Sequence, residues 1–208
     1  MKKIDLNNWD RLSHYNFFKD YEIPHLSVTN ELDVTKFVEY IKTKKIDFFK
    51  ASMYVVLRSI NEVENFRYRV LDGDVVLFDK VGSGFTFMKK PPGYCNCYVD
   101  YNPNQKEFLE NLMKITQNDE NILMPHDGLD VVYMSFLPWG KFTSVTNPYR
   151  NPKEDTIPRI LWNNAYKEGD RYKINFSVQA HHSFIDGYHI NLLHRKLRHY
   201  FNIFRIEE

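Results

Sequence analysis

The sequence predicts a single α/β (α+β) domain over residues 1–208, in which helices flank a mixed β-sheet. Segments with helical spacing and segments with strand alternation are both frequent, so neither pure class fits, and no repeat or linker divides the chain. A chain of this length favours one domain over two, and such a domain buries roughly 70% of its unfolded surface. The core is therefore large enough to hold a buried site.

The charge is almost balanced, with 28 Lys and Arg against 27 Asp and Glu and a formal net charge of +1. This balance disfavours a nucleic-acid partner, because proteins that bind polyanions carry a basic surface. The 16 Phe, 14 Tyr and 3 Trp residues are many for a chain whose mean hydropathy is -0.53. These aromatic residues either pack a core or line an apolar pocket.

The N-terminal segment MKKIDLNNWDRLSHYNFF is basic at its start but contains no apolar stretch of the kind found in signal peptides. Nowhere does the sequence approach about 18 consecutive apolar residues, the length that a membrane-spanning helix requires. We therefore expect a cytoplasmic protein with no membrane partner.

Four segments have the apolar spacing of helices. Asp33 precedes an apolar stripe over residues 34–41 at i, i+3, i+4 and i+7, which predicts an amphipathic helix with Asp33 as its N-cap. Residues 48–63 are apolar on most sides and predict a buried helix. A polar helix is expected over residues 104–117, and a last amphipathic helix over residues 188–201.

The strands are predicted from alternation and from turn residues. Asp72 and Gly73 supply the positive φ angles of a tight turn, which predicts a hairpin over residues 67–81. The Pro- and Asn-rich residues 146–158 predict a loop. Further strands are expected over residues 84–90, 94–100, 129–139 and 172–182.

Cys95 and Cys97 are the only cysteines in the sequence, in a C-x-C pattern that strand alternation places on one face. Two thiols without a second pair predict neither a zinc site nor a disulfide framework. We therefore expect no metal here and interpret both as reduced residues of a core or pocket.

His181 and His182 end the alternating segment 172–182. Adjacent strand residues point to opposite faces, so at most one of the two enters a given site. Two satisfied structural histidines are one interpretation, and a neutral imidazole acting as a general base is another. The nearby His189, His194 and His199 recur every five residues instead of at the i, i+4 interval of a helical metal pair, which disfavours zinc.

Asp186 and Gly187 follow within a few residues of the histidine pair. A carboxylate just before a glycine can shape the loop that holds the imidazole of His182, since glycine permits a sharp turn. The same pattern is also typical of an ordinary turn into the last helix.

Several ordered segments resemble one known family. HHSFIDG (residues 181–187) matches the HHxxxDG motif of the CoA-dependent acyltransferase superfamily, and the chain as a whole resembles the chloramphenicol acetyltransferase family. Further segments resemble that family in the same order: NWDRLSHYNFF, FRYRVLDGDVVLFD, LPWGKFTSVT and QAHHSFIDGYH. The resemblance implies a two-layer sandwich and an O-acetyltransferase that transfers acetyl from acetyl-CoA directly to chloramphenicol.

The resemblance also implies roles for individual residues. His182 corresponds to the general base, and Ser144 to the serine that hydrogen-bonds the tetrahedral oxyanion, with Thr143 as the alternative if the alignment slips by one residue. Asp186 and Arg11 correspond to an ion pair that ties the catalytic loop to the N-terminal segment. The first histidine of the motif, His181, is interpreted as structural.

Pocket residues are implied in the same way. Phe17 and Phe18 match aromatic residues that form a wall of the acceptor pocket. The family resemblance and the composition suggest Phe136, Phe142 and either Cys95 or Cys97 as further walls, and Phe49 and Tyr166 as contacts of CoA. The loop from Thr146 to Arg159 and Leu161, where the family has a threonine, depart from its pattern.

The resemblance further implies a homotrimer with each active site at a subunit boundary. Three other functions are compatible with parts of the sequence: transfer to another hydroxyl- or amine-bearing small molecule, an acyl-transfer core of the dihydrolipoamide type, and a non-catalytic binding module. The dihydrolipoamide type would require a lipoyl domain, for which 208 residues leave no room. A binding module has no reason to keep both His182 and Ser144.

Overall fold

The computed structural model describes residues 1–88, 94–117 and 126–206. Its main feature is a seven-stranded sheet, in which six strands follow the order β2-β10-β8-β7-β5-β6 and the seventh, β9, pairs with β10. The strands β5, β7 and β8 are parallel and the other pairs antiparallel, which confirms a mixed sheet. The strands are β2 His25–Asp33, β5 Gly82–Met88, β6 Tyr94–Val99, β7 Val131–Leu137, β8 Arg159–Asn163, β9 Tyr166–Glu168 and β10 Arg171–His181.

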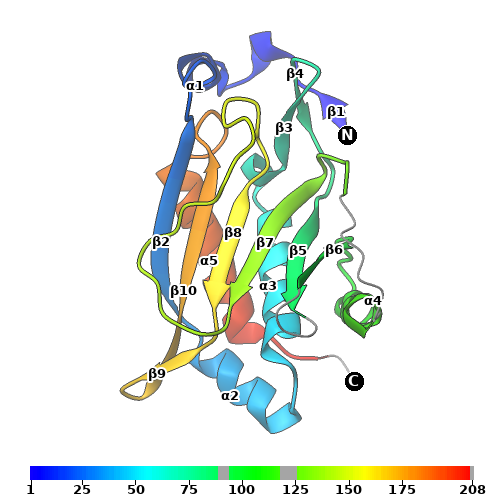
Figure 1. Ribbon diagram of the computed structural model, residues 1–208, viewed down its shortest axis with the longest axis vertical. Helices are drawn as coiled ribbons and strands as arrows, with labels where there is room; N and C mark the ends of the chain where they lie inside the picture. The colour runs from blue at the N-terminus through cyan, green and yellow to red at the C-terminus, as the bar shows by residue number, and fades with distance from the viewer. Residues whose placement is uncertain (89–93, 118–125, 207–208) are drawn as a thin grey trace.

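Helices cover one face of this sheet (Figure 1). The two longest helices, α3 (Phe48–Asn61) and α5 (Gly187–Ile203), lie behind the central strands, while α4 (Gln105–Gln117) lies beside β6. Alternate residues of β8 and β10 point into the layer between sheet and helices, and Trp162, Phe176 and Val178 are fully buried there. The sheet and the helices thus form the two predicted layers.

The helix termini follow the expected capping chemistry with one difference. Asp47 accepts a hydrogen bond from the Lys50 N–H at 2.8 Å and caps α3. The helix α2 (Thr35–Lys44) has Val34 at its N-cap position, so the prediction of Asp33 as its N-cap was wrong. Asp33 instead accepts from the N–H of Thr35 at 3.0 Å and supports the same first turn from one residue earlier.

The predicted hairpin lies at one end of the main sheet. Its strands β3 (Tyr68–Leu71) and β4 (Asp74–Leu77) join through Asp72 and Gly73, whose φ angles of 52° and 83° are the positive values expected. The short strand β1 (Lys2–Lys3) pairs with β4 and completes a three-stranded sheet. Single turns of 3-10 helix lie at Leu6–Asn8 and Glu64–Arg67.

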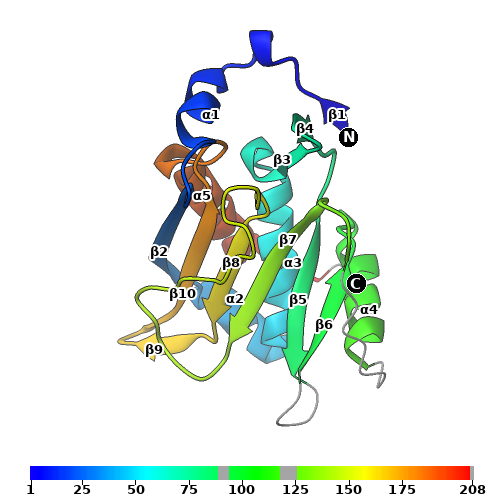
Figure 2. The same ribbon diagram turned by 45° about the horizontal axis from the view of Figure 1, so that its top comes forward.

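The short helix α1 (Leu12–Phe18) lies over the ends of β2 and β10, close to the hairpin (Figure 2). It is held there by an aromatic cluster in which the ring of Trp9 lies 5.3 Å from Tyr68, 5.9 Å from Tyr15 and 6.0 Å from Phe184. Because Phe184 follows the histidine pair, this cluster joins the N-terminal segment to the end of β10.

The segment between β7 and β8, residues 138–158, passes over the sheet face that the helices leave uncovered (Figure 1). This agrees with the loop predicted over residues 146–158. Among the described residues, no helix has the length and apolar character needed to cross a membrane.

Candidate active site

His182 lies immediately after β10 and is held from both sides. Its backbone N–H donates to the carbonyl of Pro24 at 2.7 Å, which ties it to the segment before β2. Its imidazole stacks on the ring of Phe18, with centroids 4.2 Å apart and planes inclined by 11°. The ring therefore has a defined orientation against the end of α1.

The two ring nitrogens of His182 differ in their surroundings. Nδ1 is buried and has no hydrogen-bond partner among the described residues. The residue as a whole is only partly buried, so Nε2 is the nitrogen that a substrate can reach. A neutral ring with the proton on Nδ1 has its lone pair on Nε2, as a general base requires.

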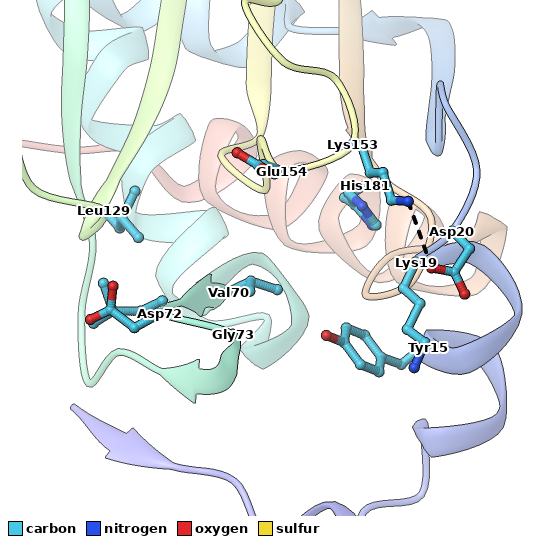
Figure 3. A pocket seen from close by; sticks show the side chains of 11 residues that line it. Tyr15, Lys19, Asp20, Val70, Asp72, Gly73, Leu129, Lys153, Glu154 and His181 are labelled. Atoms are coloured by element: carbon cyan, nitrogen blue, oxygen red, sulfur yellow. Dashed lines mark ion pairs between the residues drawn. The ribbon is translucent and has the colours of Figure 1, made fainter.

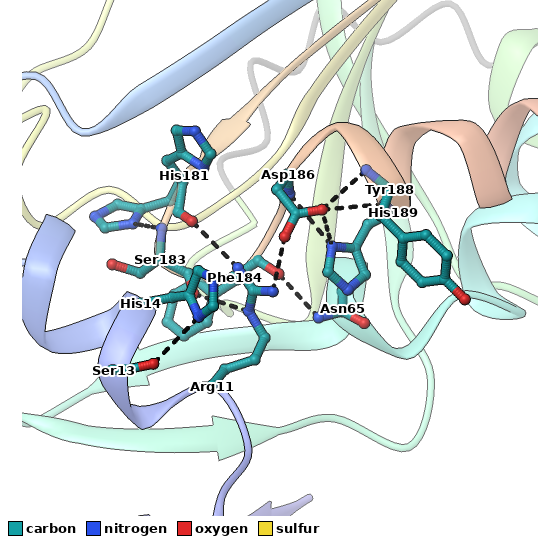
Figure 4. A network of polar contacts seen from close by, with 11 residues as sticks. Arg11, Ser13, His14, Asn65, His181, Ser183, Phe184, Asp186, Tyr188 and His189 are labelled. Atoms are coloured by element: carbon teal, nitrogen blue, oxygen red, sulfur yellow. Dashed lines mark hydrogen bonds and ion pairs between the residues drawn. The ribbon is translucent and has the colours of Figure 1, made fainter.

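Arg11 fixes the backbone around His182 with three hydrogen bonds (Figure 4). Its guanidinium donates to Asp186 Oδ2 at 3.0 Å, to the carbonyl of Ser183 at 3.1 Å and to the carbonyl of His182 at 3.4 Å. Only 7% of Arg11 is exposed, so these contacts are shielded from water. The structure thus brings together Arg11, Asp186 and His182, which the sequence placed at opposite ends of the chain.

Asp186 has a second task as the N-cap of α5. Its Oδ1 accepts from the backbone N–H groups of Tyr188 at 2.9 Å and His189 at 3.4 Å. Burial disfavours its charged form, but the hydrogen bond from Arg11 and the charges of His189 and Arg11 outweigh burial and lower the pKa of Asp186 to about 2. The carboxylate is therefore ionised throughout the neutral pH range.

His181 points away from these groups and is only 3% exposed. Its Nδ1 accepts from the N–H of Ser183 at 3.3 Å, and its ring lies 5.4 Å from that of His25. Burial, followed by the neighbouring His25, lowers the pKa of His181 to about 4, so the ring is neutral at pH 7. This environment supports a structural role for His181.

A cavity of about 570 Å³ lies between α1, the β3–β4 hairpin and the loop before β8 (Figure 3). His181 and Tyr15 form part of its wall, and Lys153 and Asp20 form an ion pair of 3.7 Å across its rim. His182 is absent from its lining. The only imidazole here is neutral and already hydrogen-bonded, so we do not assign the chemistry to this cavity.

Ser144 lies in the loop between β7 and β8 and is exposed. The loop is anchored close to β10, because Asn147 donates through its backbone N–H and its side chain to Gln179 Oε1, both at 2.9 Å. Beside it, the Ser27 hydroxyl donates to the Val145 carbonyl at 3.1 Å. Ser144 itself makes no hydrogen bond with any described residue, His182 included.

The predicted pocket residues divide into two groups. Phe18 stacks on His182, and Phe17, 62% exposed, packs on Phe18 with ring centroids 4.9 Å apart. Phe142 is half-buried in the loop before Ser144. Phe136 instead packs on Phe49, with ring centroids 5.3 Å apart. Phe49 is buried in the core and Phe136 is half-buried against it on the helix side of the sheet, so Phe136 as an acceptor contact and Phe49 as a CoA contact stay predictions.

Tyr166 lies in β9, at the start of β10, where its hydroxyl donates to Glu31 at 2.7 Å and Lys141 lies 3.7 Å above its ring. It pairs with Lys173, eight residues before His181 along β10. At about 3.3 Å per residue, roughly 26 Å separates it from the histidine pair in the same chain. The structure therefore does not bring Tyr166 to His182.

A second cavity, of about 370 Å³, opens on the sheet face away from the helices and was not predicted from the sequence. Tyr133, Asn147 and Arg159 line it, with Arg159 bonded to Asp155 Oδ2 at 2.6 Å. Leu161 lies beside it, between Ser135 and Ser177 in neighbouring strands. The only sequence signal for the wall of this cavity was the strand alternation predicted over residues 129–139, which contains Tyr133.

The comparison with known proteins decides the family. Residues 1–198 match the family described as chloramphenicol acetyltransferase. The chain belongs to the chloramphenicol acetyltransferase family. A chloramphenicol acetyltransferase of Proteus mirabilis is 25% identical over 201 residues, covering 95% of this chain and 93% of the relative. One of Staphylococcus aureus is 28% identical over 195 residues, covering 91% of this chain and 93% of the relative.

A solved structure of a chloramphenicol acetyltransferase has the same fold, with a TM-score of 0.87 and 26% identity over 96% of this chain and 99% of that one. The family match extends over both partners of the Arg11–Asp186 ion pair. The family resemblance inferred from the ordered sequence segments is therefore confirmed.

Proposed function

We propose that the protein transfers the acetyl group of acetyl-CoA to a hydroxyl group of chloramphenicol. The observation that carries this proposal is His182, a partly exposed imidazole whose ring and backbone are fixed while Nε2 stays accessible. The family match and the names of the relatives support the substrates. Acetyl-CoA acts as a substrate, and the whole chain works as one cytoplasmic domain.

The mechanism is direct transfer. Nε2 of His182 removes the proton from the acceptor hydroxyl while its oxygen attacks the thioester carbonyl carbon, a contribution of ~10²–10⁴-fold in rate. The Ser144 hydroxyl donates to the oxyanion of the tetrahedral intermediate. When the carbon–sulfur bond breaks, the CoA thiolate takes the proton from His182. No acyl-enzyme forms, because the acceptor oxygen attacks the thioester itself.

Assembly into a homotrimer is part of the same proposal. Within one chain Ser144 does not bond His182, and Phe17 and Trp139 expose 62% and 71% of their surface. Apolar area of this kind is usually covered in an oligomer. In the trimer, His182 of one chain faces a pocket built largely by its neighbour. Light scattering should give three times the chain mass of 25.0 kDa, and a fully active monomer would contradict the shared site.

The cavity on the open sheet face favours a second candidate acceptor. The guanidinium of Arg159 and the amide of Asn147 place polar groups in its otherwise mostly apolar lining, and these groups can hydrogen-bond a more polar acceptor. A different hydroxyl- or amine-bearing small molecule is therefore the alternative acceptor.

A thiol-release assay separates the two candidates. Acetyl-CoA is supplied with chloramphenicol or with a panel of unrelated alcohols and amines, and the acetylated product is identified by mass spectrometry. We expect CoA to be released in proportion to acetylated chloramphenicol. Turnover with another acceptor but none with chloramphenicol would support the proposed mechanism and contradict chloramphenicol as the substrate. No turnover with any acceptor would contradict both the mechanism and the substrate.

A further inference from the structure

The two cysteines of the chain form a close pair that the proposed reaction does not use. Both lie on β6, which pairs only with β5 in the described part of the sheet. As residues i and i+2 of a strand they point to the same face. Their sulfur atoms are 3.6 Å apart, and neither is in a disulfide.

The strand geometry suits a bridging atom better than a disulfide. Residues i and i+2 of a strand have Cα atoms about 6.4–6.8 Å apart, at the upper limit of the range seen in disulfides. The sulfur atoms would also have to move from 3.6 Å to about 2.05 Å, which would distort β6. An atom that bridges the two sulfurs can bond to both of them at their present separation.

We propose that Cys95 and Cys97 form a two-thiol site for a monosubstituted trivalent arsenical. Such an arsenic centre already carries one carbon and needs two sulfur ligands, the number that this pair supplies. Zinc prefers four ligands, and among the described residues no group of three or more His, Cys, Asp or Glu side chains is arranged for a metal ion. The ligand count therefore favours the arsenical over zinc.

The surroundings give the site one closed and one open side. Cys95 is 3% exposed, and its Sγ donates to the carbonyl of Phe87 at 3.4 Å, which fixes the inner sulfur. Cys97 is more exposed than Cys95. Its side chain lies opposite Phe85 on the helix-covered face of the sheet, because Phe85 packs on Phe49 of α3. The arsenical enters from the side of Cys97, the more exposed of the two, and its organic group remains on that side.

The reaction is a condensation without oxidation or reduction. An arsenic(III) oxide R–As=O reacts with the two S–H groups to form two As–S bonds, and the oxygen leaves as water with the two thiol protons. A single thiol gives only one As–S bond, which a competing monothiol displaces. The closed ring formed by two thiols resists monothiols and is opened by a competing dithiol.

Phenylarsine oxide is the probe, added to the full-length protein. Because the chain contains only two cysteines, Cys95→Ser and Cys97→Ser are matched variants that each keep one thiol. Intact mass spectrometry in excess 2-mercaptoethanol should show one phenylarsenic group per wild-type chain, lost on adding 2,3-dimercaptopropanol. Both variants should lose at least nine tenths of the adduct. A wild-type adduct that the monothiol removes, or equal adducts in the variants, would overturn the proposal.

Thermal unfolding tests whether the folded strand, and not merely the C-x-C sequence, forms the site. A ligand that binds the native state more tightly than the unfolded chain raises Tm. At ~100 times Kd the wild-type Tm should rise by roughly 5 °C or more, with no rise in either variant. A fall in wild-type Tm would mean that the unfolded chain binds better, and it would reject a site built by β6.

Discussion

The ring of Phe18 lies almost parallel to the imidazole of His182, with centroids 4.2 Å apart. Phe18 is the last residue of α1, and His182 is the first residue after β10. One face of the imidazole is therefore covered by a segment from the other end of the chain. This contact restricts rotation of the ring, while the accessible Nε2 remains at its edge.

Replacing Phe18 by Ala should lower kcat by about 10–100-fold, because the imidazole loses the surface that aims it and small misplacements of a catalytic group are costly. Phe18→Tyr keeps a ring of the same shape and should stay close to wild type. Steady-state kinetics and the crystal structure of each variant check this. A Phe18→Ala enzyme with unchanged kcat would show that the stack does not position His182.

His182→Ala should reduce turnover by ~10²-fold or more while acetyl-CoA still binds, because the base acts on the acceptor oxygen. Calorimetric titration with acetyl-CoA measures the binding. For His181→Ala we expect the loss of activity to follow the loss of folded protein, since its ring is buried and neutral. A stable His181→Ala protein with a purely catalytic defect would show that His181, and not His182, is the general base.

Ser144→Ala should lower kcat by ~10²–10³-fold with little change in KM, because an oxyanion contact forms chiefly in the transition state. Thr143→Val is the matched control, removing the adjacent hydroxyl. Initial-rate measurements over both substrates separate the two constants. If KM rises instead, Ser144 contributes to binding of the substrate in its ground state. If Thr143→Val shows the larger loss in kcat, Thr143 donates the hydrogen bond to the oxyanion.

The ion pair between Arg11 and Asp186 should couple strongly in a double-mutant cycle with Arg11→Met and Asp186→Asn. Leaving one buried charge without its partner costs ~3–5 kcal/mol, and the coupling should exceed the ~0.5 kcal/mol of independent sites. Urea unfolding measures each free energy. The exposed pair of Lys3 and Asp74, 2.7 Å apart, is the control and should contribute about 1 kcal/mol or less. Additive effects at Arg11 and Asp186 would contradict the pairing.

Acid should destabilise the protein through two buried histidines. Burial is the main cause that lowers the pKa of both His181 and His194 to about 4. Below the ordinary value of about 6.5 the unfolded chain gains these protons and the folded chain does not, so the free energy of unfolding falls between pH 6.5 and pH 4 and levels off below. Each histidine contributes on the order of 3 kcal/mol to this fall.

Urea unfolding at several pH values between 7 and 4 tests this dependence. His194→Gln should flatten the fall in unfolding free energy, because one of the two protonation sites is gone. His14→Gln, at an exposed position in α1, should leave the slope unchanged. Equal slopes in wild type and His194→Gln would show that His194 does not contribute.

The sequence predicted the elements whose signals are local. The hairpin at Asp72 and Gly73 follows from two adjacent residues with positive φ, and the stripe over residues 34–41 defines α2 apart from its cap. The strands β2 and β8 and the helix α1 were not predicted. β2 lacks strict alternation because Asn30 faces the helices, where it bonds His194 across the layer at 3.2 Å.

The site was predictable only in part for a similar reason. His182, Asp186 and Arg11 belong to ordered motifs, and the structure brings them together. Phe136 has a position in the sequence that fits either face of the sheet, and only its packing against Phe49 and Trp162 shows that it lies on the helix side. Arg159 lines the 370 Å³ cavity together with the loop between β7 and β8, and local sequence signals do not predict the path of this loop.

The three hydrogen bonds of Arg11 also set the order in which the site can form. Arg11 and Asp186 are separated by 175 positions, so almost the whole chain must be synthesised before the guanidinium can form these hydrogen bonds. Contacts of such long range form slowly, because the intervening loop must close first. During synthesis, Arg11 is therefore made early but meets its hydrogen-bond partners only near the end. A chain terminated before α5 has no active site, and catalytic activity becomes a signal that translation has reached the C-terminal helix.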